Sequence, residues 1–272
     1  MEKIKNILNN KCIKLICGAA NENIKEIEKL AFVFSKAGFN MIDVSAKCDV
    51  ISAAKRGLKK AGKENDTSVC VSVGLKDDIH LSKAVINRQK CSLCKKCIEI
   101  CSQNALFSED EKIFVEEKKC IGCMKCAQVC ENQAILNEHK YKTPYEMLLH
   151  VLSEDIDCVE FHCTSADESL ILDSFNKIKS IYNGLISICL DRSKLGDDRI
   201  INLLLKMTKE TDNIMIQADG KPMSGGCDDY NSTLQTVAFA QLLRSSNINT
   251  YLVLSGGTNS KTTKLAKECD LN

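Results

Sequence analysis

Short apolar runs alternate with longer segments of helical spacing along most of the chain. The apolar runs cover residues 14–20, 40–46, 68–75, 157–163, 185–191, 213–220 and 249–257. Each run is short and apolar along its length, which is typical of strands buried on both faces of a parallel sheet. The segments after them carry apolar residues three and four positions apart, which indicates amphipathic helices. The pattern therefore predicts seven βα units.

Repeated βα units form either a closed (β/α)₈ barrel or an open doubly wound sheet. We favour a barrel-like α/β domain, although the chain ends at Asn272, where an eighth strand would begin. The pattern breaks between the third and fourth strands, where two cysteine-rich segments lie. We therefore expect residues 1–77 and 143–272 to be two parts of the barrel-like domain, with residues 78–142 as an inserted α+β domain.

Each inserted segment carries four cysteines with the spacing C-x₂-C-x₂-C-x₃-C. The first set is Cys91, Cys94, Cys97 and Cys101, and the second is Cys120, Cys123, Cys126 and Cys130. This is the ligand pattern of bacterial ferredoxins that hold two [4Fe–4S] clusters, in which the fourth cysteine of each run ligates the other cluster. We therefore expect Cys130 to complete the cluster of the first set and Cys101 to complete the cluster of the second.

Zinc bound by two CxxC pairs is the alternative, but it explains neither the third cysteine nor the repetition. The bacterial run usually has proline after its fourth cysteine. Ser102 and Glu131 stand at those positions here. Several lysines surround the repeats, and they form either a basic rim that docks an acidic redox partner protein or an ordinary solvated loop face.

The composition argues against several classes of protein and leaves the iron–sulfur interpretation unchanged. The chain has 272 residues and 17 cysteines, with 37 basic and 36 acidic residues. The balanced charge argues against a nucleic-acid partner held by bulk charge. The sequence shows neither a secretory signal nor a run long enough for membrane insertion, so we expect a cytoplasmic protein with reduced cysteines. Cysteines in the strand runs are then expected to pack in the core.

Polar residues at the ends of several strands could line a pocket, because the chemistry of a barrel lies at the carboxyl ends of its strands. The candidates are Asp43, Glu160, His162, Asp191 and Asp219. Gly256 and Gly257 lie in a glycine turn after the seventh strand, where barrels often bind phosphate. Strand-end hydrogen bonds and a plain tight turn are the simpler interpretations. None of these residues forms a recognisable catalytic set, so whether the protein is an enzyme stays open.

Several strand ends and the two repeats together resemble one known family. The sequences "LICGAA", "MIDVSA", "VEFHC" and "LSGGTN", with the ferredoxin repeats between them, resemble the cyanobacterial light-dependent period protein family. The resemblance covers most of the chain. It implies an iron–sulfur protein that senses cellular redox state and passes it to the circadian clock, with clock-input proteins among its partners.

Two functions follow from these observations. The first is an iron–sulfur electron relay or redox sensor with two [4Fe–4S] clusters. The second is an oxidoreductase whose clusters pass electrons to a flavin or a phosphate-bearing ligand at the barrel mouth. The insert follows the third strand, so it leaves from the strand end at which a barrel ligand would lie.

Overall fold

The computed structural model describes residues 4, 12–76, 78, 81–138, 143–209, 211–220, 230–248 and 250–271. Seven parallel strands form one sheet in the order β1-β2-β3-β8-β9-β10-β11. They are β1 (Lys14–Ile16), β2 (Met41–Ser45), β3 (Ser68–Gly74), β8 (Cys158–Cys163), β9 (Leu185–Leu190), β10 (Ile214–Asp219) and β11 (Tyr251–Ser255). All seven fall inside the predicted runs, so the mixed α/β class is confirmed.

The order of the strands distinguishes between the two predicted architectures. Strands follow one another in the sheet as they do in the chain, whereas a doubly wound sheet reverses direction part-way. Within the described residues β1 and β11 are the two edges of the sheet. The sheet is therefore wound in the manner of a barrel. The first strand is shorter than predicted, because Gly18 turns the chain with a φ of 95°.

Two compact units make up the chain, Met1–Asp157 and Cys158–Asn272. The first contains α2 (Ile24–Lys36), α3 (Cys48–Ala61) and α6 (Pro144–Leu149), together with the two cysteine repeats. The second contains α7 (Glu168–Ile181), α8 (Arg192–Leu195), α9 (Asp197–Thr208), α10 (Tyr230–Ser245) and α11 (Thr262–Glu268). The division into barrel parts 1–77 and 143–272 around an insert stays a prediction.

Helix boundaries follow local capping chemistry. The side chain of Asn23 accepts a hydrogen bond from the Glu26 amide at the start of α2, and Asp167 caps α7 in the same way. Thr143 caps α6, with Pro144 at the first helical position. None of the described helices is both long enough and apolar enough to cross a bilayer.

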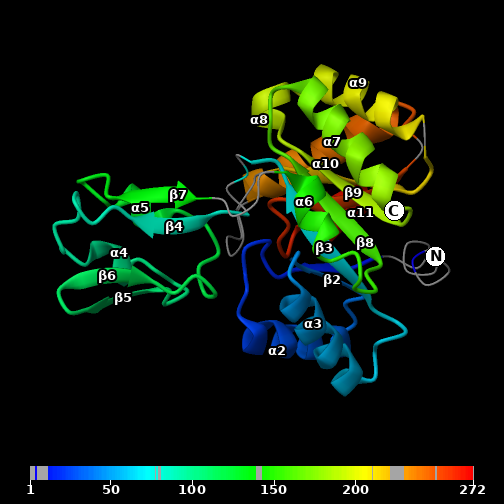
Figure 1. Cartoon of the computed structure of the whole chain (residues 1–272). Helices are drawn as coiled ribbons and strands as arrows, with labels where there is room; N and C mark the ends of the chain where they lie inside the picture. The colour runs from blue at the N-terminus through cyan, green and yellow to red at the C-terminus, as the bar shows by residue number, and fades with distance from the viewer. Residues whose placement is uncertain are drawn as a thin grey trace. The chain divides into compact units, whose positions relative to one another are not determined.

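Residues 81–138, which contain both repeats, are called the cysteine-rich segment. They form two small antiparallel sheets and two short helices (Figure 1). Strand β4 (Lys83–Ile86) pairs with β7 (Ile135–Glu138), and β5 (Leu106–Glu109) pairs with β6 (Lys112–Val115). Helices α4 (Lys96–Glu99) and α5 (Lys125–Gln128) each contain the third cysteine of a repeat. The buried core of this segment includes Cys97, Cys120 and Cys126 beside a few small and aliphatic residues. Potential metal ligands thus occupy the place of a hydrophobic core.

The two faces of the large sheet differ in chemistry, although its central strands β2, β3 and β8 are completely buried. In β3, Val69, Val71 and Val73 share one face, while Ser68, Cys70 and Ser72 share the other. In β8 the polar positions are Glu160 and His162. We expected strands that are apolar along their length. The structure instead buries a polar face, because side chains at alternate positions of a strand point to opposite sides.

Close packing of α2 and α3 requires a glycine at position 57. A Cβ added to Gly57 would lie 2.3 Å from the carbonyl oxygen of Glu28, which is backbone and cannot move away cheaply. We expect Gly57→Ala to destabilise the protein. Overpacking of about 1–3 kcal/mol outweighs the gain in helix propensity of about 1 kcal/mol. Urea unfolding should show a lower midpoint, whereas the exposed control Lys59→Ala should stay within about 0.5 kcal/mol of wild type.

Candidate metal centre and the polar face of the sheet

The first three cysteines of one repeat meet the fourth cysteine of the other. A small hollow in the cysteine-rich segment is lined by Cys91, Cys94, Cys97 and Cys130, together with apolar side chains such as Ile86 and Ile113. Cys101, the fourth cysteine of the first repeat, does not line this hollow within the described residues. The thiols that the spacing predicts for one cluster therefore surround a common space.

The charges that act on Cys126 indicate which thiols make up the second group. Burial is the main cause that raises the pKa of the Cys126 thiol to about 11. The charges of Cys120, Cys123 and Cys101 raise it further, so these sulfurs lie near one another. Burial likewise raises the pKa of Cys97, with smaller contributions from Cys91 and Cys94. Metal ligation requires thiolates, so a bound metal cluster would offset the burial and the charges that oppose the ionisation of Cys126 and Cys97.

The cysteines of the two repeats lie at an offset of 29 residues, and several backbone angles recur at the same offset. Left-handed φ angles occur at Leu93 (60°) and Gly122 (70°), and at Lys95 (63°) and Met124 (55°). Such angles are costly for residues other than glycine and asparagine. Their repetition at equivalent positions indicates one loop shape that is required twice. Loops of this kind point successive amide groups inward and are found at iron–sulfur sites.

Amide hydrogen bonds to cysteine sulfur are repeated only in part. The Ala105 amide donates to Cys101 Sγ at 3.4 Å, and its equivalent, Ala134, donates to Cys130 Sγ at 3.3 Å. Cys120 Sγ also accepts from the Ala84 amide at 3.5 Å. Hydrogen bonds to ligand sulfurs are one of the features that set cluster potentials. The environments of the two thiol groups are therefore similar but not identical.

Glu131 stands where ferredoxins usually have proline, and it forms an ion pair with Lys96. The pair connects α4 of the first repeat to the residue after Cys130. The hydrogen bond with Lys96 lowers the pKa of the Glu131 carboxyl, and the same contact raises the pKa of Lys96. Both side chains are mostly exposed, so the pair adds little stability. The pair joins two segments that carry predicted ligands of the first group, Cys97 and Cys130.

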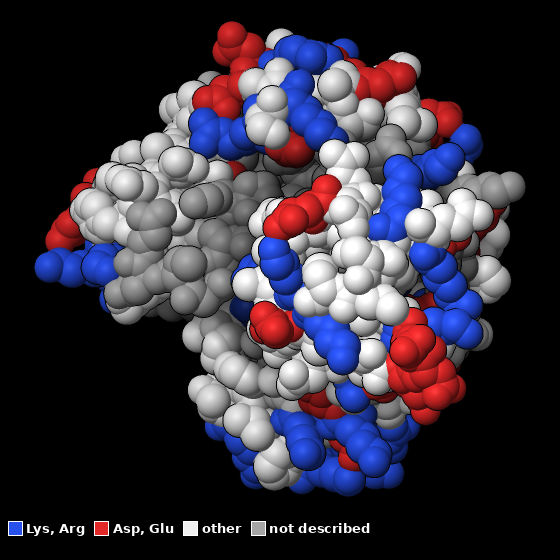
Figure 2. Space-filling model, turned by 90° about the vertical axis from the view of Figure 1, so that its left-hand side faces the viewer, with Lys and Arg blue, Asp and Glu red and all other residues white. Residues whose placement is uncertain are grey.

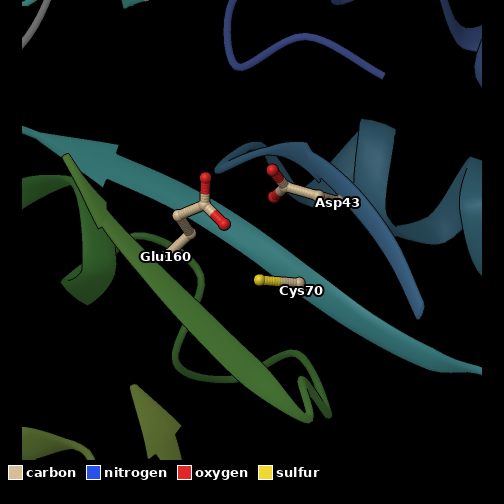
Figure 3. Close-up of side chains that lie close together, drawn as sticks. All are labelled: Asp43, Cys70 and Glu160. Atoms are coloured by element: carbon tan, nitrogen blue, oxygen red, sulfur yellow. The ribbon is translucent and has the colours of Figure 1, made fainter. Parts of the chain in front are cut away.

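On the polar face in the first unit, Asp43 is buried. Ser72 Oγ donates to Asp43 Oδ1 at 2.9 Å, and Lys14 Nζ lies 3.7 Å from Asp43 Oδ2. Asp43 and Cys70 are register partners on β2 and β3, and their side chains are drawn in Figure 3. Burial raises the pKa of the nearby Cys17 thiol, so that thiol stays protonated. Asp43 is thus bound into a network of side chains in its own unit.

On the polar face in the second unit, Glu160 and His162 are paired. His162 Nε2 lies 3.2 Å from Glu160 Oε1, and Ser187 Oγ donates to Glu160 Oε2 at 3.4 Å. Glu160, labelled in Figure 3, projects from β8. His162 is the register partner of Cys189 on β9, whose thiol donates to Asp219 Oδ2 at 3.2 Å. Three of the predicted residues therefore lie on one face of neighbouring strands.

Asp191 has a structural role that its sequence did not reveal. Its side chain caps α8, accepting hydrogen bonds from the Ser193 amide at 2.9 Å and the Ser193 hydroxyl at 2.6 Å. A capping aspartate satisfies amide groups that the first helical turn leaves unpaired. Its charge also contributes to the raised pKa of Asp219.

The glycine turn after β11 packs against α10 and Asp219. Thr236 Oγ1 donates to the carbonyl oxygen of Ser255 at 2.8 Å. A Cβ at Gly256 would lie 1.2 Å from Asp219 Oδ1, and one at Gly257 would lie 2.6 Å from Ser232 Cβ. A carboxylate thus fills the space beside the turn, which would oppose an anion there. The phosphate site stays a prediction that this geometry does not favour.

Two protein-family models and one known protein are similar to this chain. Residues 113–136, which contain the second repeat, match the model of the 4Fe-4S binding domain. Residues 150–272 match the light dependent period A C-terminal domain. The protein "Light dependent period A" of Synechococcus elongatus is 26% identical over 269 residues, covering 95% of this chain and 74% of that protein. The chain is thus similar to the light dependent period A family, over its C-terminal part in the family model and over most of its length in the cyanobacterial protein. The match over residues 113–136 supports iron–sulfur binding by this chain.

Asp219 offers a test of the buried polar face. Burial raises the pKa of its carboxyl, so ionisation costs folding energy that grows as pH rises above the pKa of the unfolded chain. We expect Asp219→Asn to gain stability relative to wild type as pH rises from about 4, near the pKa of an unfolded aspartate, and the gain to level off once pH passes the raised pKa of Asp219 in the folded protein. Urea unfolding at several pH values between about 3 and about 8 measures this difference. The exposed control Asp212→Asn should not show the same trend, and an equal effect of Asp219→Asn at all pH values would contradict the assignment.

Proposed function

We propose that the chain is an iron–sulfur redox protein with two [4Fe–4S] clusters and acts as an electron relay or redox sensor. One observation carries this proposal: Cys130 of the second repeat lines the same hollow as Cys91, Cys94 and Cys97 of the first. The proposed ligands are then Cys91, Cys94, Cys97 and Cys130 for one cluster and Cys120, Cys123, Cys126 and Cys101 for the other. Zinc requires no such exchange between repeats.

The residues around the thiols suit this chemistry. When bound, a [4Fe–4S] cluster takes up and releases electrons one at a time. Amides of Ala84, Ala105 and Ala134 donate to ligand sulfurs and stabilise their negative charge. Apolar side chains of the small core, including Leu106, Ile113 and Ile135, pack around the buried cysteines of both groups and shield them from water. These groups can bind a redox centre and partly insulate it.

The similarity to the cyanobacterial relative gives this function a context. We propose that the chain passes cellular redox state to a protein partner, in the way that the family resemblance implies for the circadian clock. Figure 2 shows acidic and basic side chains interspersed on the face that it draws. A partner held by bulk charge, such as nucleic acid, would need a surface dominated by basic groups. Recognition by a protein surface fits this distribution better.

A second function has one observation in its favour. Within the described residues, Gln217 Nε2 and Asp219 Oδ1 are buried on the polar face without hydrogen-bond partners. Unsatisfied buried polar atoms occur at binding sites, because a ligand or water can complete them. An oxidoreductase with a flavin at this face would use them. The relay or sensor is preferred, because its ligand set is complete and specific.

The metal content tests the first function. Protein purified without oxygen should contain about eight iron and about eight acid-labile sulfide per chain, as two four-iron clusters require. Stoichiometric zinc without sulfide would exclude the proposal. Acid release on the same sample tests the alternative, because a flavin at about one per chain in the supernatant would favour the oxidoreductase.

The exchange of the fourth cysteine is tested by a matched pair of variants. In Cys101→Ala, we expect Cys120, Cys123 and Cys126 to become open to alkylation while the other ligand group stays protected. In Cys130→Ala, we expect Cys91, Cys94 and Cys97 to become open to alkylation instead, while the second group stays protected. Alkylation of the native protein followed by peptide mass spectrometry reads this out. If Cys101→Ala instead exposed Cys91, each repeat would hold its own cluster.

A further inference from the structure

Lys83 is a buried cation at the first position of β4. Its side chain is 6% exposed, and its ammonium donates to the carbonyl oxygens of Glu117 at 2.7 Å and Cys120 at 2.8 Å. The amide of the next residue, Ala84, donates to Cys120 Sγ. A positive charge and an amide donor thus meet at one proposed ligand of the second group. A buried lysine is rare unless it is paired.

The same ammonium also reaches the loop between β1 and α2, which we call the β1–α2 loop and which spans residues 17–23. Lys83 Nζ donates to the carbonyl oxygen of Ala20 and lies 3.4 Å from Glu22 Oε1. The Glu22 amide donates to the carbonyl oxygen of Lys118 at 3.2 Å. The next residue, Asn23, caps α2. Lys83 therefore joins the loop before Cys120 to the start of α2.

The other repeat supplies an internal comparison. Lys112 occupies the equivalent position, 29 residues after Lys83 and at the first position of β6. Lys112 is exposed, whereas Lys83 is buried. Sequence repetition alone therefore does not explain the contacts of Lys83. They depend on the β1–α2 loop, which only one of the two equivalent strands reaches.

A buried charge acts strongly on a nearby redox centre. Attraction between charges a few ångströms apart is much larger in a protein interior than in water. Reduction adds one negative charge to a cluster, so a fixed positive charge favours the reduced form. Glu22 opposes this effect, since its carboxylate lies against the same ammonium. The two side chains should therefore shift the potential in opposite directions.

We propose that Lys83 couples the redox state of the Cys120 cluster to the β1–α2 loop. Lys83 raises the reduction potential of that cluster, and the charge gained on reduction draws the ammonium away from Ala20 and Glu22. One electron from an external low-potential reductant enters the cluster, and no covalent bond changes. The proposal rests on the proposed function, because it requires a cluster on the Cys120 set. It assigns to Lys83 the link that a sensor needs between its redox centre and the rest of the chain.

Three variants of the full-length, iron-loaded chain test the coupling by redox titration monitored by electron paramagnetic resonance. Lys83→Met should shift one of the two clusters to lower potential, so that its reduced fraction falls several-fold at a fixed ambient potential. Glu22→Gln should shift the same cluster to higher potential. The matched control Lys112→Met should leave that cluster unchanged. A merely structural role would loosen the site in both Lys83→Met and Glu22→Gln and shift the potential in one common direction, which would overturn the proposal.

Hydrogen exchange tests the mechanical half of the coupling. In the wild type, the amides of residues 17–23 should exchange faster in the reduced protein than in the oxidised protein. In Lys83→Met this dependence on redox state should be lost, while Lys112→Met should retain it. Equal exchange in both redox states of the wild type would overturn the coupling.

The outcomes separate this proposal from the proposed function. Absence of iron and sulfide in the wild type removes the function itself. Two clusters that titrate normally but ignore both Lys83→Met and Glu22→Gln remove only the coupling. If Lys83→Met does not fold, Glu22→Gln still decides, because removing the Glu22 carboxylate leaves the positive charge of Lys83 unopposed and should raise the potential.

Discussion

The folding of the cysteine-rich segment depends on the close approach of its cysteine thiols. The hydrophobic core of this segment is small, and cysteines make up a large part of it. Small domains bury too little apolar surface to fold alone, so metals or disulfides often complete them. Buried thiols with raised pKa values, such as Cys126, resist ionisation until a metal compensates their charge. Metal binding and folding are therefore expected to be one event in this segment.

Two nearly identical repeats are placed in different surroundings. Their backbones share the same left-handed positions, so the loops themselves are alike. The differences lie in what flanks them, which is an exposed pair of Lys96 with Glu131 near one thiol group and a buried Lys83 near the other. A solvent-exposed pair changes local charge little, whereas a buried ammonium changes it strongly. Two clusters with equal ligands can thus differ in potential.

Sequence reasoning located the elements but not all of their roles. The seven strands could be placed because each is a short apolar run between helical segments. The polar face was harder to see, although alternate positions such as Ser68, Cys70 and Ser72 carry the signal. Asp191 was placed at a strand end, yet a helix begins there, and the following Ser193 was the available hint of a cap. Polar residues at every second position of a buried strand are easily mistaken for isolated polar residues in an apolar run.

The role of Lys83 could not have been predicted, because it depends on contacts between distant segments. In the sequence it is one of several lysines near the repeats and resembles Lys112 in position. Only the approach of Ala20 and Glu22, more than 60 residues earlier, buries it. The sequence suggested two roles for lysines near the repeats, a basic rim or a solvated loop face. Lys83 has neither role, because its charge points inward.

The distinction between relay and sensor depends on such inward contacts. A relay needs two redox centres, insulation from water and a docking surface, and the cysteine-rich segment can supply these alone. A sensor also needs a group that responds to the charge of a centre and contacts another part of the protein. Lys83 bonds to the carbonyl oxygen of a proposed ligand and to the loop that precedes α2. In an isolated relay, a buried ammonium would only shift the potential of the cluster, and its desolvation would cost energy. Lys83 also contacts Ala20 and Glu22 outside the repeats, and these contacts favour the sensor.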